Sequence, residues 1–234
     1  MLESRELTKK FGSKTAVDRV SVILEPGHIY AMLGPNGSGK TTWMKMAAGL
    51  IKPTSGEVFF AGRPVDIDSR RDVAYMSTEP YFYAWMSIED AGKYYADFFE
   101  DFSMDRFLSM LHDMDLNEKD KIRTLSSGMV AKMKIALTLA RDAKVYMLDE
   151  PFNGIDLLAR DDIRSAILTA AVPEKLLLLS SHLVEEMEAI ADRAFFIRKG
   201  KLVEVRDLEE MRETDGVSMA DRYRTIFGHG EVQA

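Results

Sequence analysis

Apolar positions divide the chain into short strands and helices. Residues 16–24 carry apolar side chains at largely alternate positions, which predicts a strand with one buried face. Residues 29–33 and 176–179 are wholly apolar and predict buried strands. Residues 88–99 and 104–114 show helical periodicity instead and predict two helices. Turn residues separate these segments, so the pattern indicates a mixed α/β protein.

A phosphate-binding pattern follows the apolar run at residues 29–33. Residues 34–42 match G-x-x-x-x-G-K-[ST] without a gap, and a helical stretch at residues 41–50 comes next. The segment reads Gly34, Pro35, Asn36, Gly37, Ser38, Gly39, Lys40, Thr41, Thr42. Its glycines let the backbone curl so that N–H groups and the helix N-terminus form an anion cradle. In such a loop Lys40 reaches the β- and γ-phosphates, and the Thr41 hydroxyl holds Mg²⁺.

Two acidic residues end another apolar segment. Residues 144–150 predict a buried strand that finishes with Asp149 and Glu150. In a chain with a phosphate loop, an acid at a strand end suits Mg²⁺ binding, and the acid beside it can polarise a water molecule. Adjacent acids are also common in surface turns, so this pattern is less specific than the phosphate loop.

Three further positions admit a structural and a functional interpretation. Ser126 or Ser127 is placed to cap the helix that follows, and this helix start is also a potential anion site. His182, which follows the strand at residues 176–179, either packs or caps a helix, or points at bound phosphates. Phe11 lies near a turn and, taken alone, is a packing residue.

Aromatic residues crowd the chain between Tyr81 and Phe102. Helical periodicity indicates that roughly residues 85–122 form a helical insertion. Packing within a small helical subdomain accounts for most of these aromatics. The alternative is that some of them line a groove that receives another protein.

Composition narrows the functional classes. A chain of 234 residues suits one large domain or a domain with an inserted subdomain, and its net charge of −7 argues against a general nucleic-acid binder. The absence of cysteine excludes disulfides and thiolate metal sites. No signal peptide is evident, and no apolar run approaches the ~20 residues that span a bilayer. We therefore expect any membrane role to depend on a partner.

The order of these motifs resembles the ATP-binding subunit of an ATP-binding-cassette (ABC) transporter over roughly residues 2–205. The matching segments are Walker A (residues 34–42), a signature similar to LSGGQ (residues 125–129), Walker B with the catalytic glutamate (residues 145–150), the D-loop (residues 153–156), the switch histidine (His182) and the adenine-stacking aromatic (Phe11). The phosphate loop alone is shared with many kinases and GTPases. The signature and the histidine, at these distances, identify the cassette family.

The resemblance implies a P-loop NTPase core of the ABC ATPase type, with an N-terminal antiparallel β subdomain and an inserted α-helical subdomain. We expect one ABC ATPase domain over residues 1–234. Residues 1–84 and 143–205 would form the nucleotide-binding core with the β subdomain, residues 85–142 the helical signature subdomain, and residues 206–234 a short C-terminal tail.

The resemblance also implies that two cassettes pair head to tail and clamp ATP between them. One cassette offers residues 34–42, and the other offers Ser126, Ser127 and Gly128 at the start of its signature helix. A helix end that binds the γ-phosphate favours closure only while that phosphate is present. ATP therefore holds the pair together, and hydrolysis releases it.

The catalytic roles carried over from the family are specific. Glu150 would orient and deprotonate the attacking water, and His182 would contact the γ-phosphate. Thr41 and Asp149, directly or through water, would hold Mg²⁺. Asp156 would link the two sites across the interface.

Two departures from the family pattern affect these expectations. Thr78 stands where the family has a Mg²⁺-contacting glutamine, so this contact is lost, passes through water, or is taken over by Glu79. In the signature, Ser127 replaces a glycine and Met129 replaces the glutamine. We expect hydrolysis to be retained but slow.

The predicted function is that of an ATPase subunit with ATP and Mg²⁺ as cofactors. Its loops resemble those of bacterial exporters of antibiotics or peptides, which implies a separate multi-span membrane subunit that docks near residues 81–102 at the cytoplasmic face of the membrane. A homodimer is the simplest working assembly. The alternatives are a non-transport ABC ATPase and an ATP-dependent regulatory module, although the long coiled-coil insertions of repair-type cassettes are absent.

Overall fold

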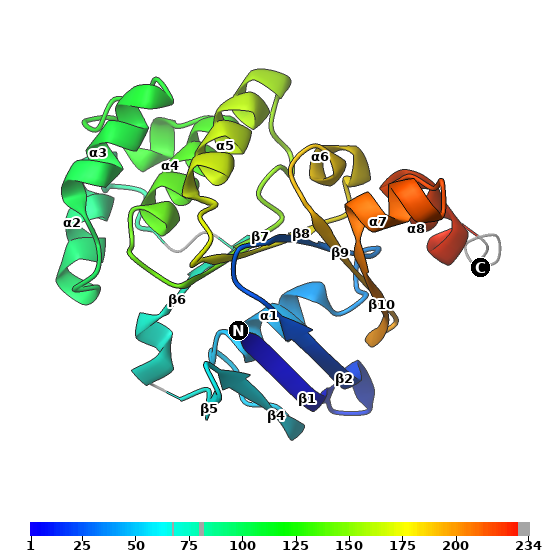
Figure 1. Cartoon of the computed structure of the whole chain (residues 1–234). Coiled ribbons are helices and arrows are strands. Elements are labelled where there is room, and N and C mark those ends of the chain that lie inside the picture. Colours follow the sequence, from blue (N-terminus) through cyan, green and yellow to red (C-terminus); the bar gives the residue numbers. More distant parts are fainter. Residues whose placement is uncertain (67, 80–81, 229–234) are drawn as a thin grey trace.

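The computed structural model describes residues 1–66, 68–79 and 82–228, which form two β-sheets with helices packed against them (Figure 1). The larger sheet has the strand order β10 (Lys201–Asp207), β9 (Arg193–Arg198), β3 (Ile29–Leu33), β8 (Leu176–Ser181), β7 (Val145–Asp149) and β6 (Val73–Met76). Only the pair β10 and β9 is antiparallel in the described sheet. The predicted apolar runs form the central strands β3 and β8, which are buried throughout.

The smaller sheet is antiparallel, and a helix separates it from the larger one. Its strand order is β2 (Lys14–Leu24), β1 (Leu2–Phe11), β4 (Ser55–Phe60) and β5 (Arg63–Pro64). The largely alternate pattern predicted over residues 16–24 is confirmed: buried and exposed positions alternate over residues 20–24, Val17 is also buried, and the alternation breaks at Asp18 and Arg19. Helix α1 (Lys40–Ala47) lies between the sheets, where the fully buried Trp43 packs edge-on to Phe195 at 5.3 Å between ring centroids.

A second group of helices covers the opposite face of the larger sheet. Helices α2 (Ile88–Phe98), α3 (Met104–Asp113) and α4 (Ser127–Leu139) share an apolar core, and α4 also packs against α5 (Leu157–Ala170). The aromatic segment contains both buried and exposed residues, so packing within the helical group accounts for part of it. Tyr95 is buried in this core, whereas Trp85 and Phe98 are 64% and 66% exposed. Tyr81 lies outside the described residues.

The C-terminal segment contains more structure than the sequence pattern predicted. The segment expected to be a short C-terminal tail contains two helices, α7 (Leu208–Thr214) and α8 (Met219–Phe227). Leu208, Met211 and Met219 are buried in the same apolar cluster as residues of the larger sheet, beside α6 (Val184–Glu188). In the described part of the chain, no helix combines the length and apolar character that crossing a bilayer requires.

The packing of α7 predicts a clear difference between neighbouring positions. Met211→Ala should lower the free energy of unfolding by about 2–5 kcal/mol, because it opens a cavity in the core. Glu209→Ala, exposed on the same helix, should change it by less than about 0.5 kcal/mol. Urea unfolding followed by circular dichroism measures both values. Equal stability of the two variants would contradict the burial of α7.

Candidate active site

Parallel pairing brings the carboxyl ends of three strands to one edge of the larger sheet. β3 leads into residues 34–39 and α1, β7 ends at Asp149, and β8 is followed by His182. β8 pairs without a register shift with both β3 and β7, so these segments open on the same edge. Ligands of open α/β sheets bind at this edge, outside the carboxyl ends of the strands.

The phosphate loop is tightly curled, and two of its glycines are required by close contacts. A Cβ on Gly34 would lie 2.3 Å from the carbonyl oxygen of Ile197. Gly39 has φ +109°, and a Cβ there would lie 2.5 Å from the carbonyl oxygen of Ala16. Lys40 is buried and donates from Nζ to the carbonyl oxygen of Gly34 at 2.7 Å. The loop therefore folds around its own lysine at the N-terminus of α1, as an anion cradle requires.

Glu150 lies between two other side chains of the site. Its Oε1 is 3.3 Å from Lys40 Nζ, and its Oε2 is 2.9 Å from His182 Nδ1. Glu150 has φ +51°, in the left-handed region that non-glycine residues rarely adopt, and its N–H donates to both the carbonyl and the hydroxyl of Ser180. Such backbone strain is common at functional sites, and here it aims the carboxylate at the lysine and the histidine.

Asp149 is fully buried and receives a hydrogen bond at each carboxylate oxygen. Ser180 Oγ donates to Oδ1 at 2.5 Å, and the Tyr75 hydroxyl donates to Oδ2 at 3.1 Å. The pKa of Tyr75 is raised mainly by burial and secondly by the negative charge of Asp149, so the phenol remains a donor. Each carboxylate oxygen keeps a lone pair for a water molecule or an ion.

The oxygen donors at this edge fit Mg²⁺. No cluster of three or more acidic, histidine or cysteine side chains suited to a metal occurs in the described residues. Asp149 and the Thr41 hydroxyl offer only a few hard oxygen ligands. This donor set suits Mg²⁺, which keeps several waters and is completed by substrate phosphates.

A cleft of about 300 Å³ lies over the phosphate loop. Phe11, at the end of β1, contributes a ring that is 54% exposed, which leaves an aromatic face for stacking. The cleft is lined by Phe11, Lys14, Ala16, Asn36, Gly37, Ser38, Gly39, Lys40, Thr41, Thr42 and Glu150. The structure thus brings the expected base-stacking, phosphate and carboxylate positions to one cavity.

The signature residues lie apart from this cleft. Ser126 caps α4 and accepts a hydrogen bond from the N–H of Met129 at 3.2 Å, which confirms one of the two predicted caps. Ser126 and Ser127 are exposed, and Gly128 is buried near Ala159. Helix α4 packs on the face of the larger sheet opposite to α1 (Figure 1). Within one chain, the tip of the signature helix does not line the phosphate cleft.

Thr78 lies in the loop that follows β6 and is exposed. Its carbonyl oxygen is 3.3 Å from Nζ of Lys134, and the carbonyl oxygen of Ser77 also accepts from this lysine. Glu79, the alternative to Thr78, forms an ion pair with Lys45 at 3.3 Å. The main polar contacts of this loop are therefore with two lysines.

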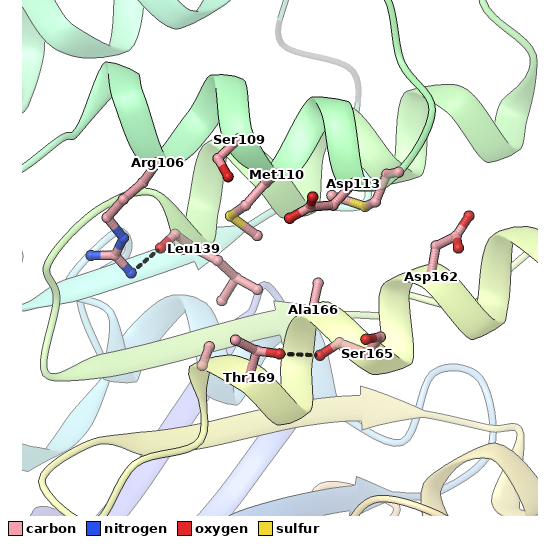
Figure 2. A pocket seen from close by; sticks show the side chains of 11 residues that line it. Arg106, Ser109, Met110, Asp113, Leu139, Asp162, Ser165, Ala166 and Thr169 are labelled. Atoms are coloured by element: carbon pink, nitrogen blue, oxygen red, sulfur yellow. Dashed lines mark hydrogen bonds between the residues drawn. The ribbon is translucent and has the colours of Figure 1, made fainter.

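Another hollow, of about 310 Å³, lies between α3 and α5 (Figure 2). Arg106 and Met110 of α3 face Ala166 of α5 across it, and Arg106 donates to the carbonyl oxygen of Leu139 at 3.0 Å. No residue predicted for the site lines this hollow. We therefore assign the site to the cleft over the phosphate loop.

The sequence patterns did not identify three residues that contact predicted site positions: Tyr75 and Ser180, which donate to Asp149, and Lys134, which contacts the carbonyl of Thr78. Ser180 is the residue that pairs with Asp149 across β7 and β8. A hydroxyl residue at the end of an apolar strand was the only local signal for it. Tyr75 and Lys134 looked like ordinary members of a strand and a helix, so only their tertiary contacts revealed them.

Known proteins similar in sequence to this chain are named as ATP-binding proteins of ABC transporters. The family model described as "ABC transporter" matches residues 17–153. The lantibiotic transport ATP-binding protein SrtF of Streptococcus pyogenes is 33% identical over 205 residues, 87% of this chain and 89% of SrtF. The uncharacterized ABC transporter ATP-binding protein YcbN of Bacillus subtilis is 34% identical over 91% of this chain and 71% of YcbN.

Solved structures share the fold at lower identity. An ATP-binding subunit of an ABC transporter superposes with a TM-score of 0.85 at 24% identity, covering 97% of this chain and 99% of the other. The cassette MJ0796, in a dimeric post-hydrolysis state with ADP and Pi, gives 0.78 at 22% identity, covering 89% and 99%. The chain belongs to the ABC transporter family and is an ATP-binding ATPase subunit of the cassette type.

The support of Asp149 can be tested through Ser180. Ser180→Ala removes the donor to a buried carboxylate, so the free energy of unfolding should fall by about 1–3 kcal/mol and ATP hydrolysis should slow. Ser181→Ala is the matched control, because the Ser181 hydroxyl accepts only from the N–H of Leu183 among the contacts described. Urea unfolding and phosphate release measure the two effects. A larger loss in the control would contradict the assigned role.

Proposed function

We propose that two copies of this chain close around ATP, each supplying the phosphate cleft for one nucleotide and the tip of α4 for the other. The observation that carries this proposal is the separation of Ser126 from the cleft within one chain, although its helix start is exposed. A second copy brings the tip to the phosphates. The γ-phosphate then attracts the N-terminus of α4 and stabilises the closed pair.

Glu150 is the proposed general base. Its carboxylate lies between Lys40 and His182, and ATP phosphates compete with it for the Lys40 ammonium. Glu150 then remains beside His182, free to orient a water molecule and to accept its proton. Thr41 and Asp149 would hold Mg²⁺, which neutralises phosphate charge. His182 would contact the γ-phosphate, and the base would stack on Phe11.

This mechanism predicts an ATP-dependent dimer when turnover is blocked. Glu150→Gln should bind ATP but lose its base, with hydrolysis reduced by roughly 10²–10⁴-fold. Size-exclusion chromatography with ATP and Mg²⁺ should then show a long-lived dimer. Lys40→Ala in the same background is the control and should remain monomeric, because it loses the phosphate contact. Only monomer in both samples, or equal phosphate release by the wild type and Glu150→Gln, would contradict the mechanism.

The partner surface we propose lies where the helical group meets the core. A groove of about 550 Å³ there is lined by Tyr75, Tyr95, Phe99 and other residues of both parts. Beside it, Phe98 is exposed on α2 and its ring lies 4.7 Å from that of Tyr94. Exposed aromatics next to an apolar groove are typical of protein interfaces. We propose that a cytoplasmic segment of a separate multi-span membrane subunit docks here, which places the chain at the cytoplasmic face of the membrane.

The class of cargo is proposed from similarity. SrtF is named as a lantibiotic transport protein, and it aligns with most of this chain. We propose that this chain drives export of a peptide, an antibiotic or a similar amphipathic molecule. The membrane subunit would select the cargo, and ATP hydrolysis by a homodimer of this chain would drive its transport.

The docking surface can be tested by copurification. A candidate multi-span membrane subunit, sought in the neighbouring reading frames and given an affinity tag, should retain the wild-type chain in detergent. Phe98→Ala should reduce the retained fraction about tenfold, as expected when an interface aromatic worth more than 1 kcal/mol is truncated. Leu168→Ala, an exposed apolar residue of α5, should be retained normally. Equal retention of both variants would exclude this surface.

A further inference from the structure

Three donor side chains are spaced seven residues apart along α4 and just beyond its end: Ser127, Lys134 and Arg141. Seven residues are nearly two helical turns, so Ser127 and Lys134 lie on one side of α4, and Arg141 follows just after the end of the helix. Each donates to backbone carbonyls outside the helical group. These bonds are Ser127 Oγ to Gly154 O (3.0 Å), Lys134 Nζ to Ser77 O and to Thr78 O (3.3 Å), and Arg141 Nη1 to Val73 O (3.0 Å).

Two of these contacts hold β6 at both of its ends. Arg141 binds the carbonyl of Val73, the first residue of β6, and also pairs with Asp101 at 3.1 Å. Lys134 binds the carbonyl of Ser77, immediately after the last residue of β6. Tyr75, in the middle of the strand, donates to Asp149. Helix α4 is therefore connected through β6 to the carboxylate that would hold Mg²⁺.

Lys134 places a charged ammonium group in a buried position, which costs free energy. The side chain is only 7% exposed, and burial lowers the pKa of Lys134 while the charge of Asp149 opposes the shift. Burying an ammonium group costs free energy unless polar partners replace the lost water. An apolar side chain would suffice to pack α4. We therefore attribute two roles to the ammonium group: it binds the carbonyls of the loop after β6, and it compensates the negative charge of Asp149.

We propose that Lys134 is a positioning residue for ATP hydrolysis, which fixes the backbone of Ser77 and Thr78 beside the nucleotide site and connects this loop to the signature helix. Lys134 anchors this loop through backbone carbonyls rather than through the exposed Thr78 side chain. Because α4 is one rigid helix, a shift of the loop shifts the helix tip at Ser126. The inference rests on the proposed two-chain ATP site.

Hydrogen exchange of the full-length chain tests the anchor itself, without nucleotide. Lys134→Met should increase amide exchange at residues 77–79 and at residues 126–129, because both segments lose a common support. Lys132→Met is the matched control. Lys132 lies on the same helix but binds Asp162 at 2.5 Å and the carbonyl of Met114, so its loss should leave residues 77–79 unchanged.

Steady-state hydrolysis tests the role in catalysis. Lys134→Met should lower kcat about tenfold with the KM for ATP within about twofold, because a charged hydrogen bond that orders the site is lost. The Mg²⁺ concentration for half-maximal rate should fall roughly two- to fivefold, because a cation near Asp149 no longer repels the metal. Lys134→Arg keeps the charge and should restore the Mg²⁺ dependence.

The outcomes separate this inference from the proposed function. Unchanged exchange at residues 77–79 together with wild-type kcat and Mg²⁺ dependence in Lys134→Met would overturn the role of Lys134, even where Glu150→Gln dimerises with ATP. Increased exchange would support the anchor even where that dimer did not form, and the failure would then lie with the two-chain site. If Lys134→Met does not fold, Lys134→Gln takes its place in the same measurements.

Discussion

The parallel pairing of β8 with both β3 and β7 is the constraint on which the site depends. It places a phosphate loop, a pair of acids and a histidine at one edge, although these segments lie far apart in the chain. The pairing also sets Asp149 opposite Ser180, so a hydroxyl reaches a buried carboxylate. A register change of one residue would turn each side chain to the other face of the sheet, and Asp149 would no longer lie opposite Ser180.

The site combines strain with compensating hydrogen bonds. Glu150 adopts a left-handed backbone conformation, and the N–H group exposed by that conformation finds two acceptors on Ser180. The same carboxylate contacts Lys40 and His182. The side chains that would bind phosphate, activate water and report the γ-phosphate therefore form one connected network, in which a change at one member reaches the others.

Helix α4 connects this network to the rest of the molecule. Its N-terminal residues Ser126 and Ser127 are exposed, its apolar residues belong to the helical core, and Lys134 reaches the loop after β6. The aromatic groove lies against the same loop, because Ser77 and Glu79 also line it. One helix and one loop thus join the nucleotide site, the proposed dimer surface and the proposed membrane-partner surface.

The sequence by itself determined the elements with strong local signals. The phosphate loop, the buried strands β3, β7 and β8, the alternating strand β2 and a cap at Ser126 or Ser127 follow from periodicity and from local backbone chemistry. Most residues that line the cleft could also be predicted, because the motifs and the resemblance place them near phosphate, whereas Lys14 and Ala16 were not predicted.

Only the tertiary structure decided which distant groups meet. The pairing of Asp149 with Ser180, the choice of Ser77 and Thr78 as partners of Lys134, and the burial of Met211 depend on register and packing between segments far apart in sequence. It also separated Tyr95, which is buried, from exposed aromatics of the same segment. Periodicity describes one face of one element, whereas these outcomes depend on what another element places against that face.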